Sequence, residues 1–180
     1  MGLDMSLTKK VYVKNWDHYE PKDRYSVLVK KGGEKVDLGN VSAVVTEIGD
    51  WRKANAIHNW FVQNTQGGDD QNGVETFVEH DKLQNLLFLV NEVLDSCELV
   101  DGEIQNGYTY HDGKQVPIMQ KGKTIKDPTV AQKLLPTQSG FFFGSTNYDQ
   151  YYYGDLVYTQ KVLKEALKDK EGCFYYSSSW

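Results

Sequence analysis

Residues 51–64, WRKANAIHNWFVQN, combine an arginine, a histidine and three asparagines in one short segment. Arginine offers a planar fork of N–H donors that matches a phosphate, and asparagine offers a donor beside an acceptor, as a nucleobase edge does. In a helix, a step of about 100° per residue places Arg52, Asn55, Asn59 and Gln63 in one stripe. The stripe therefore predicts an anion- or nucleobase-binding surface. The alternative is a solvated helix face, which more often carries Lys and Glu.

His58 lies on the apolar side of the same predicted helix, at the edge of a face that contains Trp51, Ile57 and Phe61. Two interpretations stay open. A histidine on an apolar face is more often a hydrogen-bonded core residue than a ligand. Alternatively, His58 acts as a general acid or base, with Arg52 stabilising charge, in a small hydrolase or nucleotide-modifying enzyme.

A second candidate site lies in residues 135–156, LPTQSGFFFGSTNYDQYYYGDL. Here Gly144, Ser145 and Thr146 are predicted to open a helix, where free backbone N–H groups and the helix dipole attract anions. The chain has no G-x-x-x-x-G-K-[ST] lysine, which excludes a P-loop. The competing interpretation is capping, because Thr146 with Asp149 three residues later is a variant of the capping box. Capping by Thr146 would block part of the anion site.

Asp155 falls within the stripe of the same helix that we expect to be buried, beside Tyr152 and Leu156. An acid on an apolar face needs a partner. Arg52 is the candidate partner.

The elements that must position these residues are predicted from periodicity and turn chemistry. Short β-rich runs fill the first 45 residues, and further strands are expected in VETFVE and in the tail GCFYYSSSW. Leucines and valines at i, i+3 and i+4 spacing predict a helix that begins near Asp81, and Asp112-Gly113 predicts a hairpin turn. We therefore predict an α+β fold with a mostly antiparallel sheet, as a single globular domain over residues 1–180. Its main helices are expected at about 47–65, 81–96 and 147–168, with a short helix after Asp127-Pro128.

Composition excludes several classes of protein. The chain has 180 residues and a net charge of -5, whereas domains that bind DNA by neutralising phosphates are usually basic. Two cysteines without paired spacing exclude a zinc finger or a disulfide framework, and the four histidines show no metal-ligand spacing. No apolar segment is long enough for a membrane span or a signal peptide. We expect no metal, no cofactor and a cytoplasmic location.

The segments MGLDM, VYVKNWDH, WRKANAIHNWFVQN and LPTQSGFFFGSTNYDQYYYGDL together resemble a family of small proteins encoded by bacteriophages and prophages. The resemblance spans most of the chain and is weakest over residues 98–126. It implies a soluble accessory protein in the cytoplasm of an infected bacterial host, and it implies no catalytic residues. Accessory proteins of this kind include those that block bacterial immunity.

The resulting hypothesis is a protein that acts by binding and counters host defence. It would sequester a phosphate-bearing nucleotide signal, or it would occupy a basic groove on an immune effector, such as a CRISPR nuclease, with Asp149, Tyr151 and Tyr153. The alternatives are the small enzyme described above and a virion or assembly protein. Whether a homo-oligomer builds the site stays open. The candidate ligand- or partner-binding residues are Arg52, Asn55, His58, Asn59, Gly144, Ser145, Thr146 and Asp149.

Overall fold

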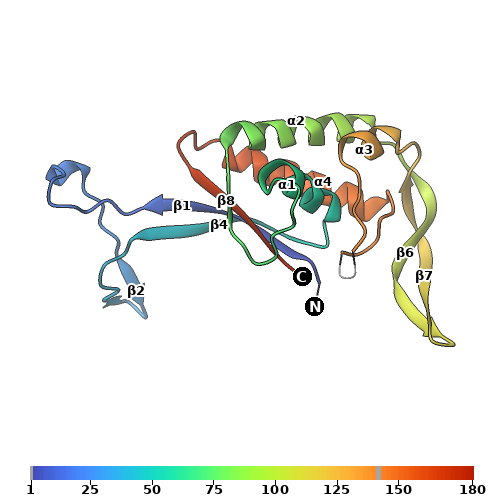
Figure 1. Cartoon of the computed structure of the whole chain (residues 1–180), viewed down its shortest axis with the longest axis horizontal. Helices are drawn as coiled ribbons and strands as arrows, with labels where there is room; N and C mark the ends of the chain where they lie inside the picture. The colour runs from blue at the N-terminus through green and yellow to red at the C-terminus, as the bar shows by residue number, and fades with distance from the viewer. Residues whose placement is uncertain (1, 141–142) are drawn as a thin grey trace.

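The computed structural model describes residues 2–140 and 143–180, and its centre is a four-stranded antiparallel sheet. The strands lie in the order β4 (Ala43–Arg52), β1 (Asp4–Tyr12), β8 (Cys173–Ser179) and β5 (Thr76–Val78). Helices cover one face of this sheet, and the other face is open (Figure 1). The prediction of an α+β fold with an antiparallel sheet is confirmed.

The helices on the sheet bury alternate strand residues and their own apolar stripes. Leu3, directly before β1, and Met5 and Leu7 within it are buried, whereas the residues between them are not, as expected for an extended segment covered on one face. The core also contains the helical stripe predicted from leucine and valine spacing. The helices are α1 (Asn55–Thr65), α2 (His80–Ser96), the short α3 (Thr129–Leu134) and α4 (Gln150–Ala166).

Two hairpins project from the two ends of the molecule (Figure 1). The long one pairs β6 (Leu99–His111) with β7 (Lys114–Ile125), and its turn uses positive φ angles at Asp112 and Gly113, as predicted. Its register shifts between Gln105 and Tyr108, so that Asn106-Gly107 forms a bulge in β6 and not a turn. The short one, β2 (Val29–Lys31) with β3 (Glu34–Val36), follows a 3-10 turn at Pro21–Asp23.

The first helix begins later than predicted, at Asn55 and not near residue 47. Residues 47–52 belong to β4, which pairs with β1 along its whole length. Trp51 is buried at the end of that strand, where its indole Nε1 donates to Thr159 Oγ1 at 2.9 Å. Lys53 then adopts a left-handed conformation, with φ of 62°, which ends the strand before the helix. Strand pairing therefore overrides the apparent helical period, and Arg52 does not lie on α1.

Helix α4 also begins later than the expected residue 147. Asp149 is the N-cap, and its Oδ1 accepts hydrogen bonds from the backbone N–H groups of Tyr151 at 2.8 Å and Tyr152 at 3.3 Å. Thr146 therefore does not cap the helix, and the turn Gly144-Ser145-Thr146 does not open it. Phe141 and Phe142, in the middle of the predicted SGFFFGST segment, lie outside the described residues.

Candidate functional site

A cavity of about 460 Å³ lies between the start of α1 and the first two turns of α4. The β6 bulge and the loop before α4 complete its wall. This volume is in the range of about 300–1,000 Å³ that small-molecule sites occupy. Segments that are distant in the sequence thus converge on one hollow. The polar residues that line it include Arg52, Lys53, Asn55, Gln105, Asn106, Ser145, Asn147, Asp149, Gln150 and Asp155.

One part of the cavity wall carries two cations beside a helix N-terminus. Arg52 ends β4 and Lys53 forms the turn, and both line the cavity with Ala54, Asn55 and Ala56. Ala54 occupies the N-cap position of α1, so no side chain caps the first-turn N–H groups. Arg52 is largely exposed, and its described ion pair is a long one, 3.6 Å from Nε to Asp4 Oδ1. The two cations and the uncapped start of α1 together form a surface that attracts an anion.

Lys53 is held in a strained conformation at this point. Left-handed φ angles are uncommon for residues other than glycine, asparagine and aspartate, and they cost about 1–2 kcal/mol. The strain is maintained because the Lys53 N–H donates to the Leu3 carbonyl at 2.7 Å. Gly144, with φ of 87°, packs against the Lys53 side chain, and a Cβ on that glycine would lie 3.1 Å from Lys53 Cβ. Backbone strain of this kind is often found at functional sites.

Asn55 fixes the loop that closes the cavity. It is buried, and its Nδ2 donates to the carbonyl oxygens of Phe143 at 3.0 Å and Ser145 at 2.8 Å. The backbone N–H of Gln138 donates to Asn55 Oδ1 at 3.1 Å. Both amide N–H groups are therefore occupied, so Asn55 shapes the cavity wall and does not offer a free donor to a ligand.

Two acidic side chains also line the cavity, those of Asp149 and Asp155. Asp155 was expected within the buried stripe of α4, but it is only partly buried and lies beside that stripe, where burial together with the nearby charge of Asp149 raises its pKa to about 7. Arg52 is not its partner: among the residues described, the Asp155 carboxylate has neither an ion pair nor a hydrogen bond. Asp149 Oδ2 is also buried without a hydrogen-bond partner in the described part of the chain. A buried acceptor without a hydrogen-bond partner costs free energy.

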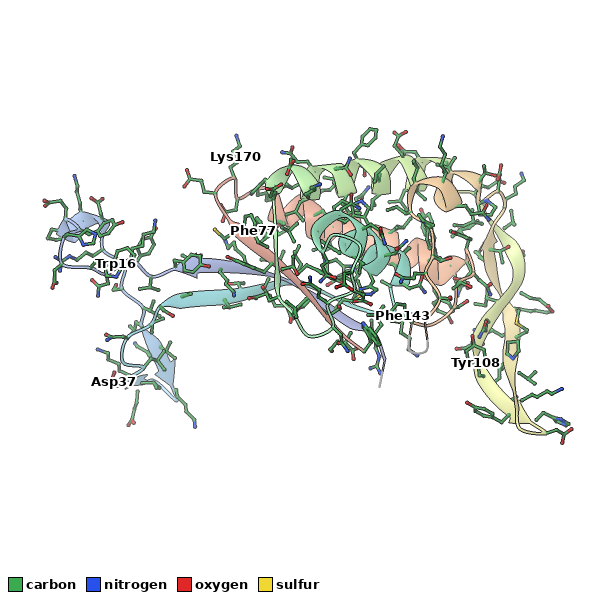
Figure 2. The ribbon with its side chains drawn as sticks, in the orientation of Figure 1. Trp16, Asp37, Phe77, Tyr108, Phe143 and Lys170 are labelled. Atoms are coloured by element: carbon green, nitrogen blue, oxygen red, sulfur yellow. The ribbon has the colours of Figure 1, made fainter. Side chains whose placement is uncertain are left out.

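Two tyrosines and a glycine form another part of the cavity wall. Tyr108, on the hairpin, and Tyr151, on α4, both line the cavity and are each about half exposed, at 46% and 47%. Figure 2 shows Tyr108 on the projecting hairpin. Gly154, one turn after Tyr151, leaves this wall open, because a Cβ at that position would have no atom within 4 Å. The cavity can therefore accept a flat ring beside two aromatic side chains.

Of the residues predicted for a site, the structure brings five to this cavity, and they come from both candidate segments. Asn59 instead donates through Nδ2 to the Pro136 carbonyl at 3.3 Å, and Thr146 is exposed with its carbonyl accepting from Thr137 Oγ1. Neither Asn59, Thr146 nor His58 lines the cavity. The residues that do are Arg52, Asn55, Gly144, Ser145 and Asp149.

His58 lies in the core with no exposed surface. Its Nε2 is 3.0 Å from Asp70 Oδ2 and its Nδ1 is 2.7 Å from the Tyr176 hydroxyl. Because an ionised carboxylate only accepts, Nε2 donates to Asp70 and Nδ1 accepts from Tyr176, whose pKa is raised by burial. Phe143 packs edge-on against the ring. Both nitrogens are thus used within the fold, as expected for a core histidine.

Sequence reasoning missed Lys53, Tyr108, Gly154 and the role of Asp155 in the cavity. The missed signal at Lys53 is local: a basic pair directly before a helix whose N-cap is alanine leaves an uncapped N-terminus beside two cations. Gly154 also carried a signal, since glycine in a helix interior costs about 1 kcal/mol relative to alanine and needs a reason. Tyr108 had none, because only the hairpin geometry brings it to α4.

Comparison with known proteins adds no relative: no family model matches the chain, no curated protein matches its sequence and no solved structure matches its fold. The cavity must therefore be interpreted from its own chemistry.

Two further observations limit the kind of site. Over residues 2–140 and 143–180, no three His, Cys, Asp or Glu residues are grouped closely enough to hold a metal ion. No helix of the described chain is both long and apolar enough to span a bilayer.

Proposed function

We propose that this protein binds a phosphate-bearing nucleotide in the cavity between α1 and α4, and that it acts by holding the ligand and not by converting it. The observation that carries this proposal is the convergence of Arg52, Lys53 and the uncapped start of α1 on one cavity of about 460 Å³. Arginine forks and helix N-termini are both suited to phosphate. The half-exposed Tyr108 and Tyr151 offer surfaces on which a base can stack.

The proposed biological role rests on the resemblance to phage and prophage proteins. A phage protein that binds a nucleotide tightly would lower the free concentration of a host immune signal. It would need a site that retains the ligand, and it would need no catalytic group. One feature supports this role: Asn55, the buried amide in the cavity wall, is engaged in holding that wall and offers no free donor.

The competing interpretations have less support in the geometry. The small-enzyme hypothesis needs His58 and Arg52 at one site, but His58 is buried in the core and does not line the cavity. The effector-inhibitor hypothesis needs Asp149 on an acidic, aromatic surface, but Asp149 is 1% exposed and caps α4. A virion or assembly role would make no use of the cavity.

The proposal is tested by incubating the protein with a panel of linear and cyclic nucleotides, separating bound from free ligand, and releasing the ligand by heat. We expect an intact nucleotide to be released. We expect the double variant Arg52→Gln, Lys53→Gln to bind at least about tenfold more weakly, since each cation supplies charge-assisted hydrogen bonds. A chemically altered product would indicate an enzyme, and failure to bind any nucleotide would contradict the proposal.

The matched control is Lys30→Gln, which removes an exposed cation from β2, in the hairpin distant from the cavity. It should bind as tightly as the unmodified protein. The Arg52–Asp4 pair is exposed, so its loss should cost less than about 1 kcal/mol and leave the protein folded. Thermal melting of each variant checks this directly.

A further inference from the structure

The acidic side chains that line the cavity, Asp149 and Asp155, indicate which kind of base a bound nucleotide carries. This inference rests on the nucleotide-binding function proposed above. Asp155 projects from α4 on the same side as Tyr151 and Gly154, one turn or less away, and all three line the cavity. Its carboxylate has no partner within the described residues. It is therefore available to accept hydrogen bonds from whatever fills the cavity.

An ionised carboxylate selects among nucleobases by the pattern of donors on their edges. It carries two oxygens that only accept, so it pairs best with two neighbouring N–H donors. The Watson–Crick edge of guanine presents such a pair, from N1–H and the 2-amino group. Adenine presents its amino donor beside an acceptor nitrogen, which an ionised carboxylate would repel.

Asp149 adds a second negative charge close enough to act on Asp155, so this part of the cavity wall favours ligand groups that donate hydrogen bonds. Asp155 is on α4 and Asp149 is its N-cap, whereas Arg52 ends β4 and Lys53 lies in the turn before α1. The cavity thus offers both acceptors and donors, which suits a molecule with a donor-rich base and an anionic phosphate.

We propose that the cavity is selective for guanine nucleotides, with the N1–H and 2-amino groups donating to Asp155 and the phosphate bound by Arg52, Lys53 and the start of α1. Tyr108 and Tyr151 flank the ring. Asp155 determines the selectivity for the base, and Arg52 and Lys53 determine the affinity for the phosphate. The two contributions can therefore be separated by experiment.

The test measures dissociation constants of the full chain for GMP, AMP, IMP and XMP by titration calorimetry at pH 8, where Asp155 is mostly ionised. GMP should bind about tenfold to a hundredfold more tightly than AMP, the discrimination expected of one bidentate contact. IMP, which lacks the 2-amino group, should bind more weakly than GMP. Equal affinity for GMP and AMP would overturn the guanine assignment and leave the proposed function intact, whereas binding of none of the four would overturn both.

The decisive variant is Asp155→Asn, which replaces one accepting oxygen by a donating amide. It should lose at least about tenfold in affinity for GMP and gain affinity for XMP, whose base has a carbonyl acceptor in place of the 2-amino donor. A simple loss of folding would not produce this exchange of preference. If Asp155→Asn keeps the preference for GMP, Asp155 does not read the base and the inference is wrong. Glu92→Gln, an exposed acid on α2, is the control for the change of charge.

Discussion

Replacing Asp155 by asparagine should stabilise the protein at neutral and alkaline pH and change its stability little in mild acid. Burial and the charge of Asp149 raise the pKa of Asp155 from 3.8 to about 7, so the folded state holds its proton over a pH range in which the unfolded chain has released it. As pH rises from about 4 to 7, the unfolded state is progressively favoured, and above about 7 the penalty is constant. Asparagine mimics the protonated side chain and removes this penalty.

The magnitude follows from the size of the shift. At about 1.4 kcal/mol per pKa unit, a shift from 3.8 to about 7 corresponds to an upper limit of about 4 kcal/mol. We expect about half of this, about 2 kcal/mol, because an ionised carboxylate that faces a cavity of about 460 Å³ keeps part of its hydration. The charged or titratable groups that line the cavity with it are Arg52, Lys53, Tyr108, Asp149, Tyr151 and Tyr152.

The assay is urea unfolding followed by tryptophan fluorescence, for the unmodified protein and the variant, at pH 4.5 and pH 8. The free energy of unfolding of Asp155→Asn should exceed that of the unmodified protein by about 2 kcal/mol at pH 8 and by much less at pH 4.5. The control Glu92→Gln should change stability by less than about 0.5 kcal/mol at both values. A variant that is less stable at pH 8, or a difference that does not depend on pH, would refute the reasoning about Asp155.

Three further predictions test the cavity and the core, chiefly by urea unfolding. Gly154→Ala should raise the free energy of unfolding by about 0.5–1 kcal/mol, because alanine favours the helix, and it should weaken nucleotide binding, because the methyl group enters the cavity. Unchanged binding would place the ligand elsewhere. Asn55→Leu should lower the free energy of unfolding by about 3 kcal/mol, since it leaves two carbonyls and one N–H without their partner. Asn59→Ala, which removes one long hydrogen bond, should lower it by less than about 1 kcal/mol, and similar losses for the two variants would contradict this reasoning. His58→Phe should cost about 2 kcal/mol because it leaves the buried Tyr176 hydroxyl unpartnered, and a stable variant would show that the histidine bonds contribute little.

The fold was predictable where local patterns and tertiary structure agree. The apolar spacing of α2 specifies both its helical state and its buried face, because that face packs against α4 and the core. The Asp112-Gly113 turn was predictable because its backbone requires positive φ. The length of the β6–β7 hairpin was not predictable, since both strands continue through residues that are typical of turns, which the bulge at Asn106-Gly107 accommodates.

The start of α1 was not predictable, because the helical periodicity of the sequence continues through the residues at which β4 ends. Trp51 and Phe61 appeared to share one helical face, and they do lie close together, with ring centroids 6.3 Å apart. They are in contact because Trp51 enters the core from strand β4 and Phe61 enters it from helix α1. No local signal reports that β4 pairs with β1 as far as Arg52.

The candidate site was predicted in parts but not as a whole. Arg52 was selected for its guanidinium and Gly144 for an expected helix start, and the structure brings both to one cavity. The helix, however, is capped by Asp149 and does not begin at Gly144. The join between the segments is made by Asn55 through bonds to Phe143 and Ser145. Such long-range contacts cannot be derived from spacing within either segment.

The position of β8 in the sheet has a consequence for how the chain folds. β8 lies between β1 and β5, and the hydroxyls of Ser6 and Ser177 meet at 3.0 Å across 171 positions of sequence. The β1–β4 pair joins strands that are close in the sequence, but the edge of β1 stays open until the distant β8 pairs with it. Closure of the sheet is therefore a late step in folding, and chains dominated by such distant pairings fold in milliseconds to seconds and are prone to aggregate while an edge is exposed.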